Sequence, residues 1–329
     1  PTLKYAFKNN RHKLRTIIAG RYLNGKITTV HSYKFVEMSV FTDEVIKKII
    51  LSSKNDDSEI PEEELSKFID IIHLVSGGHP GTIRELVEYF RDLEWIYPAD
   101  EHLQPKTVFS IAKELFVTIG RNAINTIFDT IDNETKEKLK VLCIFRKLLS
   151  VMPDSLMSDK GKFQLGPGDA NILEELAAKL LLRPPDSVNH FYSDSITRKI
   201  LWAECYFFDD DFASDNEIAM RIYDALIEGK TLHGIELRYN VTDQPLMAYM
   251  LESFYHFLYS RSLIDQPAIY DKLDYYKRNI RTFNPDHLRE KTENELKMHF
   301  RTCLEADQDI TRRLKEVNIE LEPILNRFV

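Results

Sequence analysis

Residues 62–90, EEELSKFIDIIHLVSGGHPGTIRELVEYF, contain two amphipathic segments joined by a Gly-Gly-His-Pro turn. The first segment follows Pro61 with three glutamates, and acidic side chains favour the positive end of a helix dipole. The second segment begins after Pro80, and both repeat apolar residues at the spacing of one helix face. The pattern predicts a helix–turn–helix. The residues expected to be buried are Leu65, Phe68, Ile69, Ile72 and Val75, followed by Ile83, Leu86, Val87 and Phe90.

The segment before this pair changes its period at Thr42. Residues 14–19 (LRTIIA) and 30–38 (VHSYKFVEM) have the short apolar or alternating pattern of β-strands, and from Thr42 the spacing becomes helical. We therefore predict strands within residues 1–41 and a unit of helices over residues 42–98. The expected buried face of the first of these helices consists of Val45, Ile46, Ile49 and Ile50.

The sequence after residue 98 predicts two further regions, and the fold as a whole is expected to be mainly α. Residues 99–212 combine several helices with two short apolar strands around a Pro-Pro-Asp-Ser turn, which favours a winged-helix domain. The helices are expected near 107–118, 121–131, 134–149, 169–181 and 195–208 (SITRKILWAECYFF). Residues 213–329 are rich in aromatic residues at helical spacing, so we expect a C-terminal helical arm or repeat-like region whose tyrosines pack in the core.

Composition limits the class of protein. The formal net charge of the 329 residues is −8, which disfavours nucleic acid and anionic membranes as partners. The three cysteines form no CxxC pair, so neither a zinc site nor a disulfide framework is indicated. The sequence has no apolar run of about 18 residues that could span a bilayer. We expect a cytoplasmic protein and, since position 1 is Pro1 and not Met, a piece of a longer chain.

Some stretches imitate catalytic motifs. Residues 20–26 (GRYLNGK) have P-loop spacing, but Ile27 stands where a magnesium-binding Ser or Thr belongs, and the following residues have a strand pattern. Residues 205–211 (CYFFDDD) imitate a magnesium-binding strand, although they continue a predicted helix. Glu252 and His256 share a helix face without the HExxH motif of a zinc protease. We therefore predict no metal site and no complete catalytic site in this chain.

Three segments in order carry a family resemblance: IIAGR (17–21), FVEMSVFTDEV (35–45) and VSGGHPGT (75–82). They resemble the late part of the nucleotide-binding core in signal-transduction ATPases with numerous domains, the STAND branch of AAA+-related proteins. The resemblance implies that residues 1–41 end an α/β P-loop core that binds the nucleotide and that residues 42–98 form its helical lid. The resemblance implies that Arg21 is a catalytic residue near the γ-phosphate. It also implies that Pro80 packs on the adenine. The cofactor-binding residues of this turn would be Gly77, Gly78, His79 and Pro80.

The resemblance implies a nucleotide-dependent switch. ADP would clamp the winged helix onto the core, and ATP exchange would release it for oligomerisation. Its P-loop and magnesium-binding strand would precede residue 1, so ATP or ADP with Mg²⁺ would bind the parent protein, and this chain alone would bind no cofactor. The implied partners are that N-terminal P-loop segment, other protein domains and further copies. The parent would hydrolyse nucleoside triphosphates and transduce signals, with host defence as one setting.

The sequence departs from the family, and two alternatives stay open. Ser193 stands where the family's winged helix often has a phosphate-sensing His, and His190 is out of register. One alternative is a winged-helix DNA-binding regulator that uses residues 169–181 as its recognition helix, although carboxylates there would repel phosphates. The other is a helical protein-interaction adaptor without nucleotide.

Overall fold

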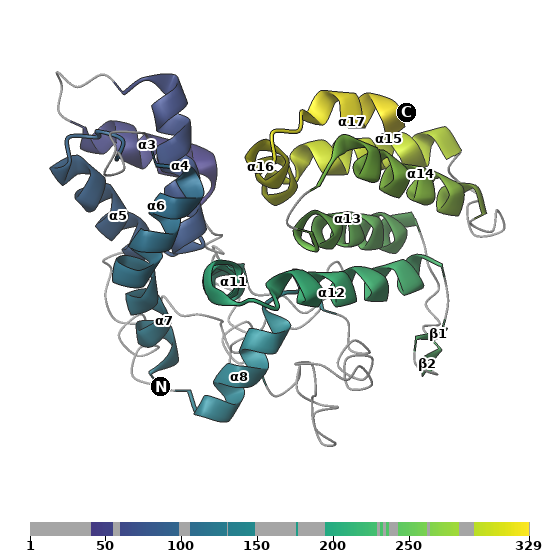
Figure 1. The fold of residues 1–329 in the computed structure, drawn as a ribbon, viewed down its shortest axis with the longest axis horizontal. Coiled ribbons are helices and arrows are strands. Elements are labelled where there is room, and N and C mark those ends of the chain that lie inside the picture. Colours follow the sequence, from purple (N-terminus) through teal and green to yellow (C-terminus); the bar gives the residue numbers. More distant parts are fainter. Residues whose placement is uncertain are drawn as a thin grey trace, which may run out of the picture. The chain divides into compact units, whose positions relative to one another are not determined.

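The structure is a computed structural model of the whole chain, and it divides into two units, Pro1–Met38 and Ser39–Val329. The residues it describes all lie in the second unit, where the predicted mainly α class is confirmed (Figure 1). The predicted strands at 14–19 and 30–38 and the predicted hairpin around residues 181–193 lie outside the described residues. The described residues are 41–54, 60–98, 106–129, 131–148, 176, 195–228, 231–232, 235–236, 243–261, 264–282 and 293–328.

Helices α3 (Asp43–Ser53), α4 (Glu62–Ser76) and α5 (Pro80–Asp92) form the predicted helical unit. Thr42 begins it, because its side chain accepts a hydrogen bond from the Val45 amide at 3.4 Å and caps α3. Val45 is 36% exposed, so its prediction as a buried residue was wrong, and Ile49 and Ile69 are half-buried. The other predicted core residues are buried: Ile46, Ile50, Leu65, Phe68, Ile72, Val75, Ile83, Leu86, Val87 and Phe90.

Four helices and a π-helical turn follow: α6 (Val108–Leu115), η1 (Phe116–Gly120), α7 (Arg121–Phe128), α8 (Asn133–Leu142) and α11 (Ser195–Phe208). Helix α6 packs on α4, and α11 packs on both α4 and α8. The helix predicted over 134–149 ends at Leu142, because the chain turns there and aims Arg146 at carboxylates of α13 and α16. Within the predicted helix 169–181 the structure describes Leu176 alone, which is helical and buried.

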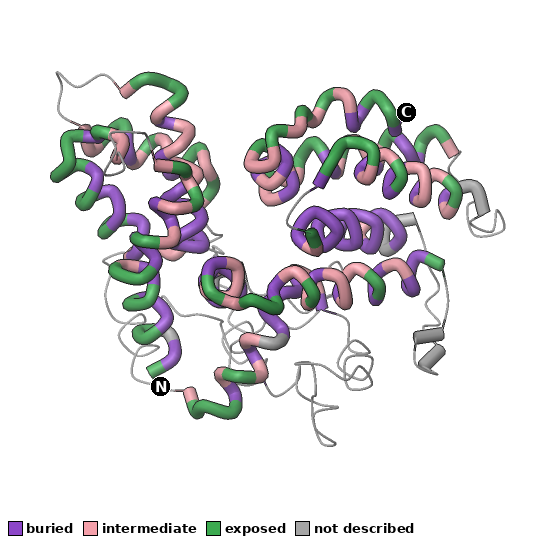
Figure 2. The backbone as a smooth tube through the Cα atoms, viewed as in Figure 1, coloured by how far each residue is buried: buried purple, intermediate pink, exposed green. Residues whose placement is uncertain are grey.

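The C-terminal arm consists of α12 (Phe212–Ile227), α13 (Asp243–Tyr259), α14 (Gln266–Thr282), α15 (Glu293–Ala306), α16 (Gln308–Glu316) and α17 (Leu321–Phe328). Between α12 and α13, β1 (Thr231–Leu232) pairs antiparallel with β2 (Ile235–Glu236). Helix α13 is buried along most of its length because α12, α15 and α16 all pack on it (Figure 2). Its tyrosines lie in the core as predicted, and none of the described helices has the length and apolarity to span a bilayer.

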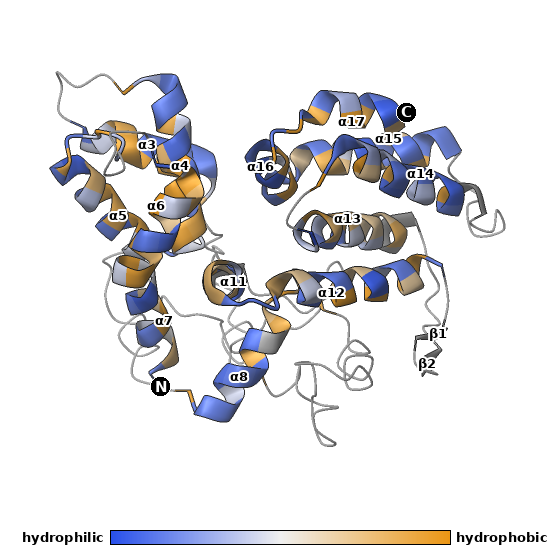
Figure 3. Cartoon of the chain, in the orientation of Figure 1, coloured by the Kyte–Doolittle hydropathy of each residue, from blue (hydrophilic) through white to orange (hydrophobic). Residues whose placement is uncertain are grey.

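The hydropathy of the helices explains this arrangement. In the outer helices, apolar residues form stripes that face their neighbours, and hydrophilic residues cover the opposite side (Figure 3). The apolar stripes merge into one buried core that extends from α3 to α17. Charged side chains are nevertheless buried where α4, α11, α13 and α16 come together, and this exception marks the candidate site.

Candidate functional site

The Gly-Gly-His-Pro turn joins α4 to α5 with a distinct role for each residue. Gly77 ends α4 at φ 57° and Gly78 continues at φ 85°, a left-handed conformation that glycine adopts readily. The His79 side chain caps α5, because its Nδ1 accepts a hydrogen bond from the Thr82 amide at 3.3 Å. Pro80 is the first residue of α5, and its exposed ring faces solvent.

Gly77 also brings the end of α4 into contact with α11. A Cβ atom at this position would lie 2.9 Å from the Lys199 Cβ and 3.0 Å from the Ile200 amide nitrogen. Any larger residue would push the two helices apart. Gly77 therefore also sets the distance between the end of α4 and α11.

The other predicted site residues are not brought together by the described part of the structure. Arg21 lies outside the described residues, as do Lys26, Ile27, His190 and Ser193. The prediction that residues 205–211 are no magnesium-binding strand is confirmed, because Cys205–Phe208 continue α11 and Asp210 and Asp211 are exposed.

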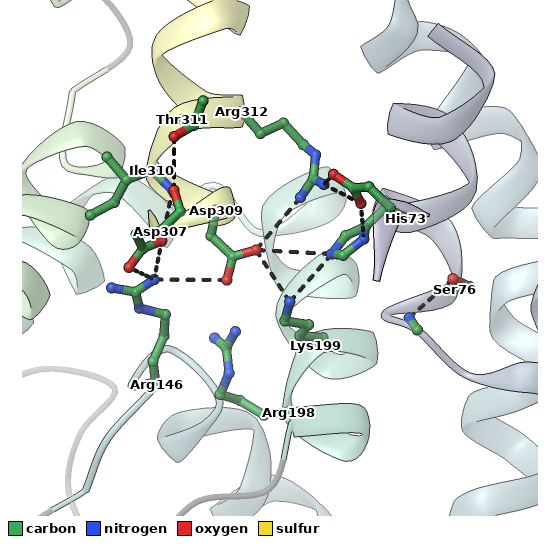
Figure 4. Close-up of polar contacts among 12 residues, drawn as sticks. His73, Ser76, Arg146, Arg198, Lys199, Asp307, Asp309, Ile310, Thr311 and Arg312 are labelled. Atoms are coloured by element: carbon green, nitrogen blue, oxygen red, sulfur yellow. Dashed lines mark hydrogen bonds and ion pairs between the residues drawn. The ribbon is translucent and has the colours of Figure 1, made fainter. Parts of the chain in front are cut away.

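Buried and half-buried charged side chains meet at the junction between α3, α4, the segment after α8, α11, α13 and α16. We call them the junction cluster, and Figure 4 shows part of it. It consists of Asp43, Asp70, His73, Arg146, Arg198, Lys199, Glu252, Asp307, Asp309 and Arg312.

Arg312 is the centre of the cluster on the lid side. Its Nη2 donates to both carboxylate oxygens of Asp43 at 3.0 Å, and its Nε donates to Asp70 at 3.3 Å. Its Nη1 lies 3.5 Å from Asp309, one turn earlier in α16. Since Arg312 is 7% exposed, these pairs are held away from water and bind α16 to α3 and α4.

His73 links the same carboxylate to α11. Its Nδ1 lies 3.0 Å from Asp43, and its Nε2 lies 3.3 Å from the Lys199 Nζ, which also donates to Asp309 at 3.2 Å. A neutral ring with its proton on Nδ1 fits both contacts, because Nε2 can then accept from the ammonium group. The chain of contacts thus runs from α3 through α4 and α11 to α16 (Figure 4).

Arg146 provides the corresponding link to the arm. Its Nε and Nη2 donate to the two oxygens of Glu252 at 3.0 Å, and its Nη1 donates to both oxygens of Asp307 at 2.9 Å. Its guanidinium carbon lies 4.0 Å from the Tyr255 ring centroid, which adds a cation–π contact. Bidentate geometry of this kind fixes orientation as well as charge.

The cluster shifts the pKa values of its members. Burial lowers the pKa of His73 below 6.5, and the Arg312 charge lowers it further. Burial alone would raise the pKa of Asp43, but the His73 hydrogen bond and the Arg312 charge outweigh it and hold the pKa below 3.8. Burial opposes ionisation of Asp309 as well, yet the charges of Lys199 and Arg146 hold its pKa far below its usual range. At neutral pH the carboxylates are therefore charged and His73 is neutral.

Sequence patterns could not have located this cluster. Arg312 and Asp43 are 269 residues apart, and Arg146 and Asp307 are 161 residues apart. One local indication existed, because His73 interrupts the apolar stripe of α4 at a buried position. Within the described part of the chain, no group of three His, Cys, Asp or Glu side chains is arranged to hold a metal ion. The ion pairs of the cluster are suited to holding these helices together.

No protein-family model matches the chain, nor does any curated protein sequence or solved structure. The resemblance to the STAND branch therefore stays a prediction that rests on the three quoted segments.

Proposed function

We propose that this chain is the C-terminal portion of a STAND-like signalling NTPase that works as a nucleotide-dependent switch in a pathway such as host defence. The observation that carries the proposal is the contact of the lid turn with α11 at Gly77. In the family that the sequence resembles, the ADP state holds the winged helix against the nucleotide-binding part. Helix α11 is the last helix of the predicted winged-helix domain, and it packs on α4 of the predicted lid.

The turn has a geometry that suits nucleotide binding. Gly77 and Gly78 are buried, whereas Pro80 is exposed at the start of α5. Its ring is rigid, apolar and without an amide hydrogen, so it can stack on a base with little loss of conformational entropy. His79 uses Nδ1 for the cap of α5, so its side chain is held beside Pro80 in the turn.

The charged character of the junction suits a switch. Buried ion pairs gain little net stability, because their attraction is offset by the loss of hydration, so such an interface can open at modest cost. A nucleotide needs only a few kcal/mol of differential affinity to shift the population between two such packings. The junction cluster is thus a reasonable latch for the closed state.

In the parent protein, most of the residues that bind and hydrolyse the nucleotide would belong to the N-terminal P-loop segment. The N-terminal P-loop segment would hold Mg²⁺ with ATP or ADP, Arg21 would face the terminal phosphate, and oligomerisation would follow release of the winged helix. This chain would not be catalytic alone. The localisation would be cytoplasmic.

The direct test uses the 329-residue chain and its parent. Calorimetric titration of the chain with Mg-ATP should show no tight binding, whereas a micromolar affinity that depends on Lys26 would place a real P-loop at residues 20–26. In the parent, a change of Pro80 to Glu should weaken ADP and ATP alike, and Arg21→Ala should weaken mainly the ATP state or its hydrolysis. If both variants bind both nucleotides as the unmodified parent does, the helical adaptor without nucleotide is the better assignment.

The DNA-binding alternative has a separate test. Its recognition helix, residues 169–181, lies outside the described residues except for Leu176. Duplex DNA at modest salt should give no sequence-selective anisotropy change. Nanomolar selective binding that is lost on changing Lys179 or Arg183 would replace the switch proposal.

A further inference from the structure

Two of the three cysteines are brought together by the fold. Cys143 follows the last residue of α8, Cys205 lies in α11, and their sulfur atoms are 3.7 Å apart. The two helices pack on each other (Figure 1). A disulfide bond needs a separation of about 2.05 Å between the sulfur atoms. The remaining gap is small against the arc that each sulfur sweeps when its side chain rotates.

The contact between the sulfur atoms is a hydrogen bond, and a second contact of Cys143 gives its direction. The Cys143 thiol donates to the Lys140 carbonyl, one turn earlier in α8, at 3.0 Å. Since a thiol has one proton, the Cys205 thiol is the donor between the two cysteines, and the Cys143 sulfur is the acceptor. A lone pair of Cys143 is thus directed at Cys205, which is the geometry for an attack on that sulfur once it is oxidised.

The two thiols differ in their access to solvent. Cys143 is 3% exposed, whereas Cys205 is half-buried. The hydrogen bond with Cys205 and burial raise the pKa of the Cys143 thiol well above its ordinary value, although the nearby charge of Arg198 opposes them. Cys205 also interacts with the Lys140 ammonium, which carries charge on the α8 side of the pair. A dissolved oxidant therefore meets Cys205 first, while Cys143 stays a thiol.

We propose that Cys143 and Cys205 form a reversible disulfide bond when the protein meets a hydroperoxide such as hydrogen peroxide. The Cys205 thiolate attacks one peroxide oxygen, the O–O bond breaks, and the other oxygen takes up a proton and leaves as water. The Cys143 sulfur then attacks the resulting Cys205 sulfenic acid, the S–O bond breaks, and the Cys143 proton leaves with the hydroxyl as a second water. Two thiols lose two electrons, and one hydrogen peroxide is reduced to two waters.

The disulfide would act on the junction cluster. Arg146 follows Cys143 by three residues, and α11 contains Lys199 and packs on α4. The two segments are already joined where Arg198 Nη1 donates to the Cys143 carbonyl at 3.3 Å. A covalent bond ties the segment of Arg146 to the helix that contacts α4. It also links residues 62 positions apart, which restricts the unfolded chain, so oxidation stabilises the closed junction.

This redox site does not rest on the proposed nucleotide switch. Neither cysteine belongs to the turn of residues 77–80, and the reaction requires a peroxide and no nucleotide. A chain that forms no disulfide would leave the tests of Pro80 and Arg21 unchanged. Failure of those tests would likewise leave the cysteine pair unchanged.

The test treats the reduced 329-residue chain with an equimolar amount of hydrogen peroxide and maps its peptides by mass spectrometry without reduction. A peptide pair joined through Cys143 and Cys205 should appear, lighter than the two separate peptides by two hydrogen atoms, and Cys303 should keep its thiol. Dithiothreitol should restore all three thiols. The oxidised chain should melt roughly 5–10 °C above the reduced chain, the shift expected for a disulfide in a chain of this size.

Three variants separate the roles of the cysteines. Cys205→Ser should abolish the disulfide. Cys143→Ala, which buries no hydroxyl group, should stop the reaction at the Cys205 sulfenic acid, and dimedone traps that product. Cys303→Ser is the matched control, because Cys303 is half-buried like Cys205, and this variant should form the disulfide as the unmodified chain does.

Oxidation in urea is the control for the fold. In the unfolded chain Cys303 should also enter disulfides, because no structure holds Cys143 beside Cys205 there. The proposal is overturned if the folded chain yields no link between Cys143 and Cys205, or if it links Cys303 as often as the unfolded chain does. An oxidised chain that melts no higher than the reduced chain would overturn the stabilisation of the junction.

Discussion

The helical unit α3–α5 and the junction cluster use opposite means of holding helices together. In the unit, Phe68 is fully buried and its ring centroid lies 4.8 Å from that of Phe90 and 5.4 Å from that of Trp95. At the junction, the half-buried Arg146 and the buried Arg312 each donate hydrogen bonds to two carboxylates. The first contact is non-directional, and the second depends on the geometry of particular atoms.

The difference determines how each region responds to change. An apolar core loses stability in proportion to the volume and area removed, whereas a buried ion-pair network fails when one member leaves the others uncompensated. Conservative substitutions in the apolar core of α3–α5 should therefore change the free energy of unfolding little, and the contribution of this core should not depend on pH. The junction should be sensitive to single charges and to protons.

The largest effect should come from Arg312→Ala. This change leaves three carboxylates, those of Asp43, Asp70 and Asp309, without their shared cation. We expect it to lower the free energy of unfolding by about 3–5 kcal/mol, the range for breaking one side of a buried pair. Urea unfolding at pH 7.5 measures the effect.

The matched control is an exposed arginine in the same arm. Arg327 pairs with Asp274 at 3.1 Å, but the two side chains are 52% and 42% exposed, so Arg327→Ala should change the free energy of unfolding by less than about 0.5 kcal/mol. Adding Asp43→Asn to Arg312→Ala should recover part of the loss, because it removes one uncompensated charge. Equal effects of the two arginine variants would show that the junction contributes no more than a surface pair.

The second effect is a loss of stability between pH 7.5 and 5.5. Burial lowers the pKa of His73, with Arg312 as the next cause, and burial lowers that of His256 well below 6.5. The unfolded chain takes up a proton on each ring near pH 6.5, whereas the folded chain resists it, so stability falls as the pH drops. We expect up to about 1.4 kcal/mol per pH unit for each histidine below pH 6.5.

Substitutions separate the two histidines. His73→Gln and His256→Phe should each remove about half of the pH dependence, and the slope is the quantity to compare because each change also alters packing. The Asp43 and Asp309 carboxylates add nothing to the slope in this pH range, because their pKa values lie below 3.8. An unchanged slope in both variants would show that neither histidine is held neutral by the fold.

The sequence predicted the elements that depend on local pattern. Helix α3 begins after Thr42, α4 ends at Gly77 and α11 spans residues 195–208, all as expected, because caps, glycines and apolar spacing act over a few residues. One helix ends earlier than predicted. The helix predicted to extend to residue 149 ends at Leu142, because Arg146 turns toward the Glu252 carboxylate, which lies more than 100 residues away in the sequence.

Of the candidate site, the sequence indicated the turn, whose role in nucleotide binding stays a prediction. The turn of Gly77, Gly78, His79 and Pro80 is visible in one stretch of sequence, and its local geometry agrees with the roles of glycine and proline there. The sequence around Asp43 does not indicate that it pairs with Arg312. A charged residue that forms a buried ion pair stands in the same local pattern as one that faces water. The sequence could not predict that the sulfur atoms of Cys143 and Cys205 lie 3.7 Å apart, because 62 residues separate the two cysteines.

The smallest effect concerns His79, where the local and the functional roles can be separated. As the cap of α5, its Nδ1 accepts from the Thr82 amide, so His79→Ala should lower the free energy of unfolding by about 1 kcal/mol. His79→Ser restores an effective cap and should unfold as the unmodified chain does. If the residue also contacts nucleotide, both variants of the parent should lose ADP affinity, because serine cannot reach as far as the imidazole Nε2. Urea unfolding of the chain and ADP titration of the parent measure the two roles. Equal ADP affinity in all three proteins would limit His79 to the cap and leave Pro80 as the turn's proposed contact with the nucleotide.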